Sequence, residues 1–135
     1  MGIKYIKLTN EDNIHNNFKF KDGLNIDTIP ISSGECKPWG IYFTTFNNIH
    51  HWLSYGDQKM YYIWDVVIPE NSKVYHYPTK SKAESIILSN CRRISELVEW
   101  NNLDFCLNAR RTSQWNKAMI PLNLLNILAK KYNWH

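Results

Sequence analysis

The segment Gly40-Ile41-Tyr42-Phe43-Thr44 constrains the fold of this chain more than any other part of the sequence. It places β-branched and aromatic residues behind a glycine, and these residue types favour a strand. A loop containing proline, serine and glycine precedes it, over residues 30–38. We therefore expect a buried strand here, with the rest of the domain organised around it.

Other segments predict further strands in the first two-thirds of the chain and helices in the last third. Alternating or nearly continuous apolar character favours strands at residues 4–8, 60–68, 73–77 and 86–88. Apolar residues recur at helical spacing over residues 47–55, before Gly56, and again after Cys91. Strands followed by helices are typical of α+β proteins. We predict an α+β module over residues 1–90 with a small mixed or antiparallel sheet, and a helical segment over residues 91–135 packed on it as one compact domain.

Composition narrows the classes of protein to which the chain can belong. Its 135 residues fit one domain of common size, and 14% of them are aromatic. The net charge of +4 is spread along the sequence, which argues against nucleic-acid binding. The amino terminus lacks the pattern of a signal peptide, and no apolar stretch is long enough to cross a bilayer, so we expect a protein that is neither secreted nor held in a membrane.

Motifs for metal binding and for hydrolysis are missing from the sequence. The three cysteines form no Cys-x-x-Cys pair, and the five histidines have no metal-ligand spacing. We expect His50 and His51 to point in different directions on a helix, so no metal site is predicted. Neither a Gly-x-Ser-x-Gly elbow nor a phosphate-binding glycine loop occurs, which argues against a serine hydrolase and a nucleotide hydrolase of those kinds.

One ordered set of segments resembles the ADP-ribosyltransferase superfamily in outline. Gly23-Leu24 comes first, the Gly40–Thr44 strand and a helix ending at Tyr55 follow, and Glu84 stands before an apolar strand. The resemblance implies that NAD or another nucleotide would bind here, with Glu84 as the catalytic carboxylate. The implied ligand-binding residues are His15, Tyr42, Thr44 and Tyr55. The bulky Trp39 beside the strand departs from this pattern and favours a structural or partner-binding role.

A second resemblance covers residues 4–90 and rests on longer runs. They are Lys4-Tyr5-Ile6-Lys7-Leu8-Thr9-Asn10, Asp22-Gly23-Leu24-Asn25-Ile26-Asp27-Thr28-Ile29-Pro30, Gly34-Glu35-Cys36, Gly40-Ile41-Tyr42-Phe43-Thr44, Val66-Val67-Ile68-Pro69 and Ala83-Glu84-Ser85-Ile86-Ile87-Leu88. With these runs the chain resembles the N-terminal module of ankyrin-repeat proteins of mimivirus-type giant viruses. No Thr-Pro-Leu-His signature of ankyrin repeats follows, so it resembles a stand-alone version of that module.

These observations leave two main functions open. The first is a giant-virus accessory protein that acts as a non-catalytic protein-interaction module, without a cofactor, in the host cytoplasm or the virion. Its partner would be a viral or host protein, or a second copy of the chain, docked on aromatic anchors such as Trp39 and Trp52. The alternative is an ADP-ribosyltransferase-like enzyme or pseudo-enzyme that binds NAD or a nucleotide. RNA binding through exposed aromatic rings and Arg110-Arg111 is a third and weaker hypothesis.

Overall fold

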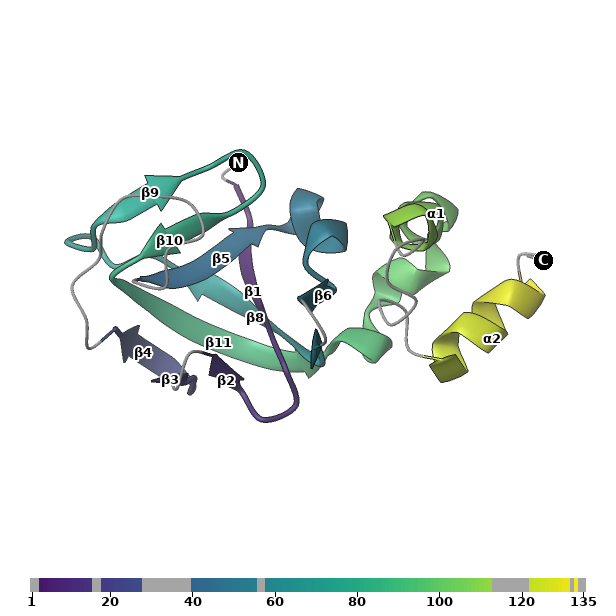
Figure 1. Cartoon of the computed structure of the whole chain (residues 1–135), viewed down its shortest axis with the longest axis horizontal. Helices are drawn as coiled ribbons and strands as arrows, with labels where there is room; N and C mark the ends of the chain where they lie inside the picture. The colour runs from purple at the N-terminus through teal and green to yellow at the C-terminus, as the bar shows by residue number, and fades with distance from the viewer. Residues whose placement is uncertain are drawn as a thin grey trace.

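A seven-stranded antiparallel sheet occupies the first two-thirds of the chain, and short helices gather at one end of it (Figure 1). The computed structural model describes residues 3–15, 18–27, 40–55, 58–112, 122–131 and 133. This arrangement confirms the predicted α+β class, with strands as the larger part. In the described part of the chain, no helix is long and apolar enough to cross a membrane.

The main sheet has a spatial order that differs from the order along the chain. From one edge to the other its strands are β4 (Gly23–Ile26), β11 (Ser85–Arg93), β8 (Tyr62–Val67), β1 (Tyr5–Thr9), β5 (Ile41–Thr45), β10 (Ser81–Ala83) and β9 (Val74–His76). Two small hairpins accompany the sheet: β2 (Ile14–His15) with β3 (Phe18–Lys19), and β6 (Ser54–Tyr55) with β7 (Gln58–Lys59). The helices are the 3-10 helices η1 (Phe46–His51), η2 (Ile94–Glu96) and η3 (Val98–Asn101), and the α-helices α1 (Leu103–Thr112) and α2 (Leu122–Lys131).

Most predicted strands are confirmed, but the helix predicted over residues 47–55 is wrong. That segment forms the six-residue 3-10 helix η1 and then enters strand β6. Asn47 and Asn48 are poor helix formers, and Thr45 makes no side-chain cap, so little favours a longer α-helix. Strand β11 is also much longer than the predicted 86–88, and it continues past residue 90.

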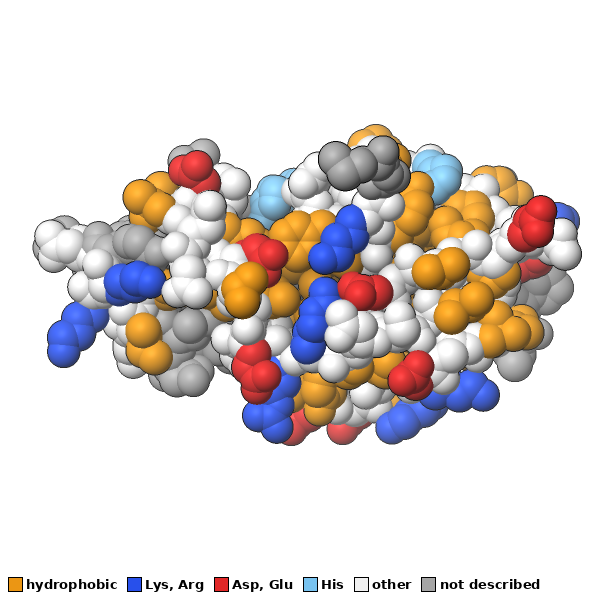
Figure 2. Space-filling model, turned by 180° about the vertical axis from the view of Figure 1, so that it is seen from behind, with side chains coloured by type: hydrophobic (Ala, Val, Ile, Leu, Met, Phe, Trp, Pro, Cys, Tyr) orange, Lys and Arg blue, Asp and Glu red, His pale blue; other side chains and the backbone are white. Residues whose placement is uncertain are grey.

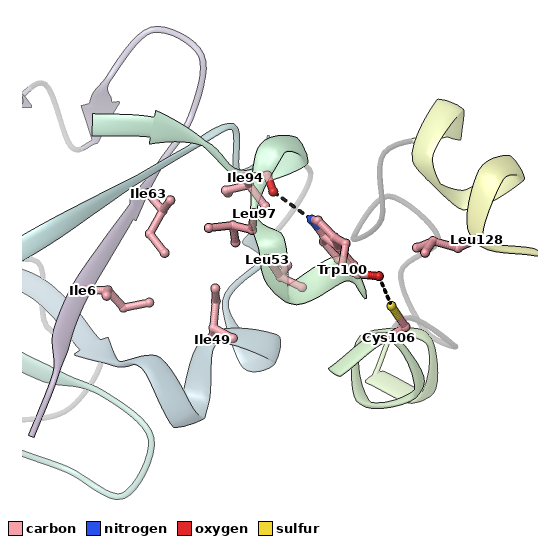
Figure 3. Packing of buried hydrophobic residues seen from close by; sticks show 9 residues of the cluster. All are labelled: Ile6, Ile49, Leu53, Ile63, Ile94, Leu97, Trp100, Cys106 and Leu128. Carbon is pink, nitrogen blue, oxygen red and sulfur yellow. Dashed lines mark hydrogen bonds between the residues drawn. The ribbon is translucent and has the colours of Figure 1, made fainter. Parts of the chain in front are cut away.

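The central strand β1 sends alternate side chains to two separate cores. Its Ile6 joins the core on the face that the helices cover, which we call the helix face (Figure 3). The buried members of this core are Ile6, Ile49, Leu53, Ile63, Ile94, Leu97, Trp100, Cys106 and Leu128. Trp100 joins η2, which directly follows β11, to α1. Its indole N–H donates to the carbonyl of Ile94 at 2.8 Å, and the Cys106 thiol donates to the Trp100 carbonyl at 3.0 Å.

The opposite side of the sheet, which we call the hairpin face, is packed near the β2–β3 hairpin. Its buried members are Phe20, Ile41, Phe43, Trp64, Val66, Ala83, Ile86 and Leu88, and Phe18 of the hairpin packs against them. The Trp64 indole N–H donates to the Thr9 hydroxyl at 3.0 Å, so the polar atom of this buried ring is satisfied.

Lys7 also points into the hairpin face, where it is almost wholly buried. Its ammonium donates to the carbonyl oxygen of Tyr42 and lies 4.4 Å from the centre of the Phe20 ring. Burial disfavours the charged form and lowers the pKa of Lys7 to about 7. A lysine that is only partly protonated near neutral pH therefore sits inside the core.

Truncating Trp100 should destabilise the protein strongly, since it removes a buried ring that links the sheet to α1. We expect Trp100→Ala to lower the free energy of unfolding by about 3–5 kcal/mol. Urea denaturation followed by circular dichroism measures the loss. Val98→Ala on the same 3-10 helix is the matched control, because Val98 is exposed and should cost less than about 0.5 kcal/mol. Equal losses in both variants would contradict the core that Figure 3 shows.

Replacing Lys7 should change how stability depends on pH. The unfolded lysine has a pKa near 10.5, so between pH 7 and pH 10.5 the unfolded chain binds a proton that the folded chain does not. Stability of the wild type should therefore rise with pH across this window, by up to about 1.4 kcal/mol per pH unit, and Lys7 should add no pH dependence below it. Lys7→Met should be more stable at pH 7, and the difference should shrink as pH rises. Urea denaturation at a series of pH values, with the exposed Lys73→Met as control, tests this; a constant difference would contradict it.

Candidate functional site

Three of the predicted site residues come together on the helix face, around the turn between β9 and β10. The Thr44 hydroxyl donates to the carbonyl of Thr79 at 2.7 Å, and the indole N–H of Trp52 donates to the same carbonyl at 2.8 Å. Tyr42 lies two residues before Thr44 on β5, so its side chain is on the same face. The fold thus gathers Tyr42, Thr44 and Trp52 at one place, from a strand and the segment after η1.

Two lysines fill the space beside these rings. The Lys80 ammonium lies 4.8 Å from the centre of the Tyr42 ring and 5.3 Å from that of Trp52. Lys82 is 0% exposed, and its ammonium lies 5.9 Å from the rings of both Tyr42 and Tyr75. Cations held over aromatic faces are stabilised by the ring electrons. The ring faces are therefore in contact with the protein's own lysines, which is a structural use of the site.

His15 lies on the other side of the sheet from Tyr42. It belongs to β2, and its neighbour is the buried Lys7 of the hairpin face. Burial lowers the pKa of His15, and the positive charge of Lys7 lowers it further. The structure therefore does not place His15 with the aromatic residues around Thr79.

Glu84 lies at the bend between β10 and β11, where it holds backbone groups of neighbouring segments. Its carboxylate accepts a long hydrogen bond from the backbone N–H of Lys73 at 3.3 Å. Its own N–H donates to the Lys73 carbonyl at 3.0 Å, and its carbonyl accepts from the N–H of Asp27 at 3.0 Å. Through these hydrogen bonds Glu84 holds the segments next to β9 and β4 against the bend between β10 and β11. Its predicted catalytic role stays a prediction.

The remaining predicted residues are only partly described. Tyr55 pairs with Gln58 in the β6–β7 hairpin. Trp39 lies outside the described residues, as do Trp115 and Trp134. Trp64 and Trp100 are buried in the two cores. Of the tryptophans in the described part of the chain, Trp52 is the one that reaches the surface in part.

The two adjacent histidines do not diverge as expected. The ring centres of His50 and His51 lie 4.3 Å apart, because both residues belong to the last turn of the tight 3-10 helix η1. Burial lowers the pKa of His50, and the neighbouring His51 adds to this effect. Within the described ranges, no group of three or more histidine, cysteine, aspartate or glutamate residues is arranged to hold a metal ion.

An exposed apolar row on the helix face was missed in the sequence. Leu24 of β4 pairs with Ile87 of β11, which in turn pairs with Val67 of β8, so the three side chains stand in line across three strands. Their exposed fractions are 47%, 36% and 59%, and Ile26, two residues along β4, is 56% exposed. We call these four residues the apolar row. Figure 2 shows hydrophobic side chains gathered on the sheet half of the molecule, with charged ones around them.

Polar groups border the apolar row on the same face. The next register position holds Ser89 of β11 and Asp65 of β8. Asp65 forms an ion pair with Arg92 at 3.0 Å and accepts a hydrogen bond from the Asn90 amide at 3.0 Å. An apolar centre with a polar rim is the usual anatomy of a protein interface.

The comparisons with known proteins connect this chain to a giant virus. No family model and no solved structure matches it. It is 28% identical over 107 residues to the "Putative ankyrin repeat protein R868" of Acanthamoeba polyphaga mimivirus, covering 73% of this chain and 51% of R868. The chain thus spans about half the length of that relative. A shorter match, 40% identical over 53 residues, joins 38% of this chain to 16% of the "Putative ankyrin repeat protein R896" of the same virus.

A further relative matches along most of its length. The "Uncharacterized protein R869" of the same virus is 30% identical over 110 residues, which is 78% of this chain and 80% of R869. The sequence resemblance to giant-virus proteins is therefore supported over most of the chain. By this match the chain belongs to the family of mimivirus proteins that includes R869.

Proposed function

We propose that this chain is a giant-virus accessory protein that acts as a non-catalytic protein-interaction module in the host cytoplasm or the virion. The apolar row is the observation that carries the proposal. Its members lie on regular, paired strands, so they present a preformed surface and need little ordering when a partner binds. A viral or host protein with a complementary apolar surface is the partner that such a row fits.

The energetics favour a contact surface over a chance exposure. Scattered exposed apolar residues are common, but the apolar row is contiguous across three strands. Burying apolar surface contributes roughly 25 cal/mol per Å². The Leu24–Ile87 pair lies between hydrogen-bonded positions of the ladder, where facing side chains come closest. A partner could therefore bury the row as one continuous patch.

The relatives support the same class of function. Two of them are named as ankyrin repeat proteins, and repeat proteins commonly present extended surfaces for binding. A module shared with such proteins fits a role in assembly or recruitment. The ADP-ribosyltransferase-like alternative takes second place, because His15 and Tyr42 lie on opposite faces and Lys80 occupies the ring faces that a nicotinamide would need.

Charging the apolar row should weaken partner binding without unfolding the protein. We expect Val67→Lys to keep the wild-type melting temperature, since Val67 is largely exposed, and to weaken binding at least tenfold, because a buried lysine would lose its hydration. The measurement is affinity purification from infected host cells with the full chain as bait, followed by calorimetry with each purified partner.

The matched control is Val98→Lys, which makes the same exchange at an exposed valine of η3. A partner that binds the wild type and Val98→Lys but not Val67→Lys supports the proposal. Equal binding to all three proteins would show that the apolar row is not the docking surface. Turnover of NAD by the purified wild type, absent from Glu84→Gln, would instead favour the enzyme.

A further inference from the structure

We infer that strand β4 pairs with the β4 strand of a second copy of this chain, joining two sheets edge to edge across a two-fold axis. The inference rests on the proposed interaction function and identifies one partner for it. It starts from the backbone of β4 rather than from its side chains. β4 is an edge strand, paired with β11 on one side only.

The hydrogen-bonding direction along β4 follows from one contact. The N–H of Asp27 donates to the Glu84 carbonyl, so Asp27 faces β11, and by alternation so does Asn25. The N–H and C=O groups of Leu24 and Ile26 therefore point outward. In the described part of the chain, no hydrogen bond joins these outward groups to another residue.

The outward groups are self-complementary. An antiparallel two-fold centred on Asn25 places Leu24 of each copy opposite Ile26 of the other, and these two residues carry all the outward groups of β4. In an isologous contact every pair of residues occurs twice, so the Leu24–Ile26 pair forms on both sides of the axis. The outward backbone groups of both copies therefore gain hydrogen-bond partners together. Side chains directly opposite share a face, so the apolar row would continue from one copy into the other.

Charges at the two ends of β4 are complementary in the same arrangement. Lys19 and Lys21 precede the strand and outnumber Asp22, whereas Asp27 and Glu84 lie together at its far end and outnumber Lys73 there. Antiparallel pairing brings the basic end of each strand to the acidic end of the other. A parallel arrangement or an unrelated extended segment would not obtain this match from the chain's own residues.

The opposite edge of the sheet is protected in a way that β4 is not. Lys73 precedes β9, and Pro78 and Lys80 follow it. Lysine and proline at a sheet edge oppose strand addition. Neither strand contains these residues itself, and Lys21 also precedes β4, so the two edges differ in the proline that follows β9 and in the two exposed apolar side chains of β4. The edge available for pairing is therefore the β4 edge.

The test compares proline substitutions at the two edges. Ile26→Pro removes an outward N–H and leaves the bonds from β4 to β11 in place, because proline is tolerated where the N–H faces solvent. Val74→Pro likewise removes an outward N–H at the β9 edge. Because the Val74 side chain packs against the hairpin-face core, this control is used with its fold checked by circular dichroism. Sedimentation equilibrium of the full chain from about 1 µM to about 1 mM covers the range expected for a small interface.

We expect the wild type and Val74→Pro to dimerise with dissociation constants within about twofold of each other, and Ile26→Pro to be weaker by at least tenfold. Ile26→Thr, which keeps the N–H, should fall between them. Amide hydrogen exchange gives a direct readout, since the Leu24 and Ile26 amides should become protected as concentration rises.

Two outcomes would overturn the inference. One is a wild type that stays monomeric over the whole range, and the other is a dimer that Ile26→Pro leaves unchanged. Neither bears on binding of a viral or host protein, which Val67→Lys tests separately. If no viral or host protein binds but Ile26→Pro weakens the dimer as expected, the β4–β4 pairing is supported and the proposed binding of other proteins is not.

Discussion

The structure depends on the position of β1 between β5 and β8, because the register of β1 with these two strands decides which side chains each face of the sheet must bury. Ile6 pairs with Thr44 on one side and Asp65 on the other, and Lys7 pairs with Trp64. The sheet consequently has two cores, one for each face. On the hairpin face, buried side chains pack around Phe20. On the helix face, the helices cover only one end, so the apolar row at the β4 end stays exposed.

Local sequence patterns predicted the strands that the fold buries on both faces. Residues 41–45 and 60–68 are examples, since β-branched and aromatic residues there coincide with positions that the fold buries. The pattern failed at η1, where apolar residues have helical spacing but Asn47, Asn48 and the following strand limit the helix to a 3-10 turn. It also could not reveal that the helical region begins with two 3-10 turns, which contain Ile94 and Trp100, rather than with an α-helix.

The candidate site was harder to predict, because its residues meet through pairing between strands that are distant in the sequence. Tyr42, Thr44 and Trp52 converge because β10 pairs with β5 and brings Thr79 to them. Nothing local indicates that His15 would lie across the sheet from Tyr42, or that Lys80 would stack on the rings. Register sets these relations, and a single sequence does not display register.

Strand β4 shows why an inconsistency between sequence and fold can carry functional information. Its polar Asn25 is 1% exposed, and its amide bonds to the backbone of Lys21 and Gly23, so the asparagine closes the turn that leads into the strand. The side chains of Leu24 and Ile26 are consequently exposed on the helix face. A polar residue is therefore buried and apolar residues are exposed, which is the reverse of the usual polarity of a half-buried strand. Places where local pattern and global fold disagree are expected at functional sites. The inverted polarity of β4 is therefore better explained by a surface that another chain covers than by the needs of this domain alone.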